Sequence, residues 1–311
     1  MGSVYDAVLV LAFGGPQRPE EIRPFLGRVL EGARVPAARL EEVARHYEAL
    51  GGRSPLNELT GRQAAALENS LGQKGYRLPV YVGMRFSAPF IRDALARMAA
   101  DGVTSALAVI LSSHQSEASW ERYQRAVAGA QSELEGRAPR VEYCPGWHAE
   151  PLFISAWKEL IEAEFQKLSP ARRATARLVF TAHSIPLAMA ERSPYVEQIR
   201  ETAALIARRL GHARWTVAYQ SRSGDPRQAW LEPDILSVLS EQARAGATEV
   251  VVAPIGFVSD HVEVLYDLDV EARKAATDLG ICFYRARCPN DHPLFIRMLA
   301  ELVVNRIEGG R

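Results

Sequence analysis

The feature that most limits the fold is a regular alternation of short aliphatic runs with segments of helical periodicity. Each run is five to seven residues long and is followed by glycine, proline or polar residues. Such runs are typical of parallel strands buried on both faces, and helices between them indicate βαβ units. The expected strands are Ala7–Phe13, Val80–Met84, Ser105–Leu111, Val141–Pro145, 176–180, Trp215–Tyr219, Glu249–Pro254 and Ile281–Arg285.

These strands form two sets of four, which predicts an α/β protein of two similar Rossmann-like domains. Each domain is expected to be a parallel sheet flanked by helices, with a cleft between the two. We assign residues 1–143 together with 290–311 to the first lobe and its C-terminal helix, and residues 144–289 to the second. A chain of 311 residues with 48% hydrophobic content is long enough for two such cores.

Composition excludes several classes of partner. Lys plus Arg and Asp plus Glu both number 37, so no global field attracts nucleic acid or anionic membranes. No run of 18 apolar residues occurs, and the N-terminus lacks a basic region before its apolar run, so we expect no stable membrane insertion. Three cysteines without CxxC spacing indicate a reducing cytoplasm, and an iron–sulfur cluster normally needs four thiolates.

Three carboxylates follow the strand that ends at Pro254. Glu263, Asp267 and Glu271 are spaced i, i+4 and i+8, which puts them on one stripe of an α-helix. Stacked like charges weaken an isolated helix, and the plain alternative is a solvated helix face. However, the helix opens directly after a buried strand, where α/β sheets bind their ligands. The stripe is therefore a candidate for a ligand site.

A histidine occupies the corresponding position after an earlier strand. His183 comes three residues after the end of the run 176–180, and Pro186 comes three residues after His183. If both strands lie in one parallel sheet, His183 and Glu263 face the same crevice. A neutral imidazole and a carboxylate can both accept protons near neutral pH.

Four segments, in order and in register, resemble the ferrochelatase family over essentially the whole chain. They are Thr181-Ala182-His183-Ser184-Ile185-Pro186; Tyr219-Gln220-Ser221-Arg222 with Trp230-Leu231-Glu232-Pro233; Gly256 to Asp269; and the turn Gly14-Gly15-Pro16 with segment Gly51–Asn57.

The resemblance implies a chelatase-like fold and insertion of Fe²⁺ into a porphyrin with release of two protons, in haem biosynthesis. His183 and Glu263 fall on the catalytic pair that binds iron in the family. Asp267 and Glu271 fall on its line of acids that leads metal toward the site. Iron is then a substrate, and no tightly bound cofactor and no iron–sulfur cluster are expected.

The resemblance is strongest to the compact coproporphyrin type. Segment Arg28–His46 is short and charged where protoporphyrin enzymes carry a hydrophobic lip. Phe13 replaces a tyrosine of the Firmicute members, and His46 replaces their propionate-binding arginine, for which Arg45 and Arg53 are possible substitutes. Binding a macrocycle needs apolar walls and anchors for carboxylates. The candidate substrate-binding residues are Phe13, Arg45, His46, Arg53, Ser54 and Tyr123.

Three alternatives stay open: a protoporphyrin IX ferrochelatase, a cobalt chelatase for a reduced tetrapyrrole, and a non-catalytic haem or tetrapyrrole carrier. A carrier needs an axial ligand but no line of acids. We further expect a monomer whose substrates are porphyrin and Fe²⁺ and which meets a haem-pathway partner only transiently.

Overall fold

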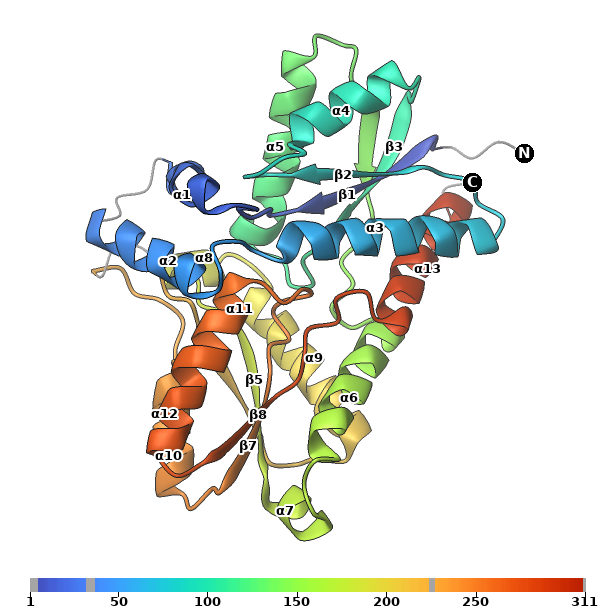
Figure 1. Ribbon diagram of the computed structural model, residues 1–311. Helices are drawn as coiled ribbons and strands as arrows, with labels where there is room; N and C mark the ends of the chain where they lie inside the picture. Colours follow the sequence, from blue (N-terminus) through green and yellow to red (C-terminus); the bar gives the residue numbers. More distant parts are fainter. Residues whose placement is uncertain (1–4, 32–36, 224–226, 310–311) are drawn as a thin grey trace.

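The computed structural model describes residues 5–31, 37–223 and 227–309 and contains two four-stranded parallel sheets (Figure 1). The first has the order β2-β1-β3-β4 and the second the order β6-β5-β7-β8. Their strands are β1 (Ala7–Ala12), β2 (Val80–Met84), β3 (Ser105–Ile110), β4 (Arg140–Tyr143), β5 (Arg177–His183), β6 (Trp215–Gln220), β7 (Glu249–Ala253) and β8 (Cys282–Arg285). All eight expected strands are confirmed, with ends that differ by at most three residues.

Strand β1 shows why aliphatic runs form the centre of each sheet. All six of its residues are buried. Ala7, Leu9 and Leu11 face a core shared with α4 (Ile91–Ala100) and α5 (Arg122–Glu133). Val8 and Val10 face the core that contains α3 (Leu56–Gln73) and α13 (Pro293–Gly309). Because side chains alternate along a strand, a strand covered on both faces must be apolar at every position.

Helices cover both faces of the first sheet. α4 and α5 pack on one face, and α3 and α13 on the other. The helices of this half, with the short η segments, are η1 (Pro19–Glu21), α1 (Ile22–Val29), α2 (Ala37–Ala49), α3 (Leu56–Gln73), α4 (Ile91–Ala100), η2 (Glu117–Glu121) and α5 (Arg122–Glu133).

The second sheet is covered in the same way. α6 and α9 lie against it on one face and α10 and α12 on the other. The helices of this half are α6 (Pro151–Phe165), α7 (Pro170–Thr175), α8 (Leu187–Ala190), α9 (Tyr195–Leu210), α10 (Ile235–Arg244), α11 (Val262–Tyr266), η3 (Asp267–Ala272) and α12 (Arg273–Asp278). The sequence did not predict the short helices α7 and α8.

α13 and a set of polar contacts join the two lobes. α13 packs against both α3 and α6, so it contacts elements that we assigned to different lobes (Figure 1). The Gln63 amide of α3 donates to the Ser259 hydroxyl at 3.0 Å and to the Asn290 carbonyl at 2.8 Å, and all three residues are buried. The predicted lobe boundary itself stays a prediction.

The strand order of the second sheet indicates the edge at which a ligand would bind. The chain runs from β5 outward to β6 and then returns to place β7 on the other side of β5. The carboxyl ends of β5 and β7 therefore flank the point where the strand order reverses, and open α/β sheets bind ligands at this point.

In the part of the chain that the structure describes, every helix is too short or too polar to span a membrane.

Candidate functional site

His183 is the last residue of β5, and its backbone contacts fix the imidazole. The Nδ1 of His183 lies within hydrogen-bond distance of the Ser184 carbonyl oxygen. A carbonyl oxygen only accepts, so Nδ1 carries the proton and Nε2 keeps its lone pair in the neutral ring. The Tyr195 hydroxyl donates to the His183 carbonyl at 2.9 Å and holds the strand end in place. The imidazole is thus set to accept a proton or a metal ion at Nε2.

Glu263 lies in the first turn of α11 and faces this nitrogen. Its Oε2 is 3.7 Å from His183 Nε2, and the two side chains are 40% and 28% exposed. Divalent first-row ions bind imidazole nitrogen and carboxylate oxygen at about 2.1 Å, so one ion can bridge atoms up to about 4.2 Å apart. The structure therefore brings the predicted pair together at a distance that suits a shared ion and leaves both groups accessible. The cleft expected between the lobes stays a prediction.

A close backbone approach makes this meeting possible. The Gly256 amide, three residues after β7, donates to the Thr181 carbonyl of β5 at 3.0 Å. A Cβ at Gly256 would lie 2.6 Å from the Ala182 Cβ and 2.7 Å from the Ala182 Cα. Only glycine fits here without a backbone shift, and any larger residue would push the loop that leads to α11 away from His183.

Gln220, at the end of β6, links the backbone of Glu263 to Thr181 of β5. Its buried amide nitrogen donates to the Glu263 carbonyl at 3.2 Å, and its amide oxygen accepts from the Thr181 hydroxyl at 2.7 Å. The sequence indicated Gln220 only as part of a matching segment and gave it no role. Its position after a strand is the signal that could have singled it out.

The start of α11 is also fixed by residues just before it. The His261 Nδ1 accepts from the Glu263 amide at 3.3 Å as the N-cap of the helix, and burial lowers the pKa of His261. Asp260, 8% exposed, accepts from Arg285 at 2.7 Å and from the Asn290 amide at 2.8 Å. A buried carboxylate held by a guanidinium and an amide resists displacement, so Glu263 stands on a rigid support.

The line of acids runs from Glu263 toward solvent. Glu263 and Asp267 are partly exposed and Glu271 is exposed. Burial raises the pKa of Asp267 to about 7, the Ser221 hydroxyl bound to its carboxylate opposes this shift, and Glu263 and Glu271 add to it. Ser221 has φ 60°, a left-handed conformation in which its hydroxyl meets Asp267. Partial desolvation likewise raises the pKa of Glu271, and nearby Arg39 opposes that rise.

The helix that carries the acids differs from the expected one. Residues 262–278 are continuously helical, as predicted, but η3 (Asp267–Ala272) is a π-helical segment. The i, i+4 spacing of Asp267 and Glu271 therefore falls in a wider turn than the α-helix that we assumed. Such segments are rare and occur frequently at functional sites.

The raised pKa of Asp267 predicts a pH-dependent gain in stability for Asp267→Asn. The folded-state pKa of about 7 exceeds the ordinary value of 3.8. The stability linked to this proton is thus complete below pH 3.8 and is lost as the pH rises through about 7. Asparagine stays neutral, so its advantage in melting temperature over wild type should be largest at pH 9 and shrink toward pH 4. A difference that does not change with pH would contradict the buried charge.

α2 of the first lobe covers this helix. The His46 ring stacks on Tyr266 of α11 with centroids 3.7 Å apart and an interplanar angle of 12°. Ala44, Tyr47 and Val262 belong to one apolar cluster beneath the stack. His46, predicted to bind substrate, therefore lies one helical turn from Glu263, and burial lowers its pKa.

The other predicted substrate-binding residues have different environments. The Phe13 ring lies 4.7 Å from Phe86, next to this cluster. Arg45 and Arg53 are exposed. Ser54 is 6% exposed, and its hydroxyl accepts from the Leu56 amide at 3.3 Å. Tyr123, 5% exposed, packs under the Arg85 guanidinium in the first-lobe core, and burial raises its pKa to about 12. Their binding roles stay predictions. Residues 32–36 of the charged segment Arg28–His46 lie outside the described residues.

Several known proteins are similar to this chain in sequence. A family model described as Ferrochelatase matches residues 5–307. The coproporphyrin III ferrochelatase of Nocardia farcinica is 42% identical over 98% of this chain and 89% of its own length. A ferrochelatase of Rhodopirellula baltica is 40% identical over 97% and 86%. The coproporphyrin III ferrochelatase of Mycobacterium leprae is 41% identical over 96% and 89%.

Solved structures agree on the fold. The sirohydrochlorin chelatase SirB from Bacillus subtilis subspecies spizizenii, in complex with cobalt, has a TM-score of 0.60 at 13% identity and covers 97% of this chain and 95% of its own. CbiX, the terminal enzyme for biosynthesis of sirohaem in denitrifying bacteria, has a TM-score of 0.57 at 18% identity over 96% and 98%. At such identities the likeness concerns the two-lobed fold alone. Because the family model and relatives of about 40% identity span nearly the whole chain, the protein belongs to the ferrochelatase family.

Proposed function

We propose that this chain inserts Fe²⁺ into coproporphyrin III, giving coprohaem with release of two protons in haem biosynthesis. The observation that carries the proposal is the 3.7 Å approach of His183 Nε2 to Glu263 Oε2 in a member of the ferrochelatase family. The relatives named as coproporphyrin III ferrochelatases support the choice of porphyrin.

His183 acts as proton acceptor and metal contact in this proposal. Metal insertion must remove two pyrrole protons, and an imidazole whose Nδ1–H is bound to the Ser184 carbonyl offers Nε2 for the first of them. Glu263 lies opposite and stabilises the imidazolium that forms. The same two atoms can contact the incoming ion, because both a neutral imidazole and a carboxylate suit Fe²⁺.

Asp267 and Glu271 supply the cation in this proposal. They lie on the same helix as Glu263 and extend from it toward solvent. Burial and the neighbouring carboxylates raise the pKa of Asp267 to about 7, and a divalent cation relieves that repulsion. An acid with a raised pKa lowers the free energy of unfolding, and proteins commonly carry such destabilising groups at functional sites.

Iron enters the proposal as a substrate, and no resident cofactor is proposed. Within the described parts of the chain, no three His, Cys, Asp or Glu side chains form one metal-binding group. An iron–sulfur cluster is not proposed, because the sequence has three cysteines where a cluster normally takes four thiolates.

The choice of porphyrin is tested by offering coproporphyrin III and protoporphyrin IX with Fe²⁺ under anaerobic conditions. Coproporphyrin carries two more propionates, and each charge-assisted bond to an arginine contributes about 1.5–3 kcal/mol. The value of kcat/KM should therefore be at least about tenfold higher for coproporphyrin. Faster turnover of protoporphyrin would contradict the substrate choice but not the metal chemistry.

The role of the acids is tested by the double variant Asp267→Asn with Glu271→Gln. We expect the KM for Fe²⁺ to rise by about tenfold while kcat falls by less than about threefold, because the acids deliver the ion without touching the porphyrin. Asp278→Asn is the matched control, since this exposed acid lies at the end of α12 and pairs with Lys274. A fall in kcat alone would exclude the delivery role.

A further inference from the structure

A polar cavity lies at the end of the second sheet that is opposite His183. It has a volume of about 290 Å³ and is lined at the start of β5 by Arg177 and at the start of β6 by Trp215 and Thr216. Arg214 and Gln242 complete its polar wall. His183 is six residues along β5 from Arg177, which at about 3.3 Å per residue is about 20 Å. The cavity is therefore separate from the proposed active site.

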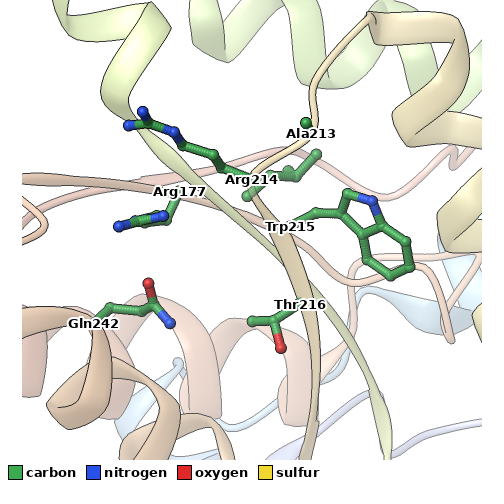
Figure 2. Close-up of a pocket in the computed structure, with 7 residues that line it drawn as sticks. Arg177, Ala213, Arg214, Trp215, Thr216 and Gln242 are labelled. Carbon is green, nitrogen blue, oxygen red and sulfur yellow. The ribbon is translucent and has the colours of Figure 1, made fainter. Parts of the chain in front are cut away.

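We propose that this cavity binds a small multivalent oxyanion, one that presents two or more charged oxygens of phosphate or carboxylate type. Figure 2 shows the guanidinium groups of Arg177 and Arg214 and the amide of Gln242 on the same side of the strands, with the Trp215 indole on the other. Two forked cations and an amide that can donate match an anion with several oxygens.

One hydrogen-bond donor of Arg177 lacks an acceptor. Its Nε is buried and has no hydrogen-bond partner. A buried donor left unpaired is costly, and nearly all such groups in native structures find a partner. An anion oxygen in the adjoining cavity would supply one.

The surrounding charges favour an anion. Across the described residues, no carboxylate forms an ion pair with Arg177 or Arg214. Glu249, at the start of the neighbouring strand β7, is held by Thr248 and by Arg172 at 3.4 Å. The cavity is thus lined by two arginines that lack a carboxylate partner among the described residues.

The size of the cavity restricts the ligand. Pockets for drug-sized ligands span about 300–1,000 Å³, so this one is at the small end. It suits an anion of the size of pyrophosphate or citrate, and a porphyrin macrocycle is too large for it.

The test is isothermal titration calorimetry of the full chain with inorganic pyrophosphate and, separately, with citrate, at low ionic strength to limit screening. We expect one anion per chain and a Kd at least about tenfold weaker in Arg214→Ala, because one charge-assisted contact is lost. Arg214 is exposed, so this variant removes no core group. Gln242→Leu should weaken binding less and provides a second variant if Arg214→Ala does not fold.

The control is Arg77→Ala, which removes an exposed arginine from the first lobe and should change the Kd by less than about twofold. Binding of pyrophosphate alone would assign the phosphate class, binding of citrate alone the carboxylate class, and binding of both their shared chemistry. If neither anion binds, or if Arg214→Ala and Arg77→Ala bind as wild type does, the proposal is wrong. The readout needs no turnover, so its failure is distinct from failure of the ferrochelatase proposal.

Discussion

His183→Ala should lower kcat for metal insertion by about 10³-fold or more while the Kd for porphyrin changes by less than about tenfold. The variant removes both the proposed proton acceptor at Nε2 and the proposed contact to the ion, and general base catalysis alone contributes about 10²–10⁴-fold. The imidazole is 28% exposed and its ring hydrogen bond goes to the adjacent Ser184 carbonyl, so the fold should tolerate its removal.

Anaerobic single-turnover kinetics with Fe²⁺ and fluorescence titration of the porphyrin measure the two quantities separately. His148→Ala is a suitable control, because this histidine is also partly exposed and pairs with Glu201 in the helix α9. Its turnover should stay within about threefold of wild type. Unchanged turnover in His183→Ala would remove His183 from the mechanism.

Glu263→Gln should lower kcat by about 10²-fold or more with little change in folding. Glutamine has nearly the same shape, so the Gln220 bond to the backbone carbonyl of residue 263 and the His261 cap on its amide are kept. The lost negative charge no longer stabilises the imidazolium of His183 or holds the cation. Asp278→Asn, which also neutralises an acid of this helix, should keep turnover within about twofold of wild type.

The sequence predicted the strands and the position of the candidate pair because both follow from local patterns. Aliphatic runs in the sequence identify β5 and β7. The polar residues that follow parallel strands lie at the same edge of the sheet. The close approach of Gly256 to Ala182 then brings the segments at the ends of β7 and β5 into contact. The family resemblance is confirmed by the match over residues 5–307.

Contacts between distant segments could not be predicted in the same way. The Ser221 bond to Asp267 depends on a left-handed backbone at the end of β6, and the stack of His46 on Tyr266 depends on how α2 packs across the second lobe. The π-helical turn is another such feature, since its residues follow an ordinary helical pattern in sequence. The burial of Tyr123 beside Arg85 is a further such feature, since it depends on tertiary packing, and the predicted substrate-binding role of Tyr123 stays a prediction.

In the proposed mechanism, His183 and Glu263 act as one unit on one ion and its exchanged protons. A double-mutant cycle on kcat, with His183→Ala, Glu263→Gln and the combined variant, measures their coupling directly. We predict that the combined variant is about as slow as His183→Ala alone, because each residue works only in the presence of the other. If the two losses multiply instead, the residues act independently and the account of a shared site is wrong.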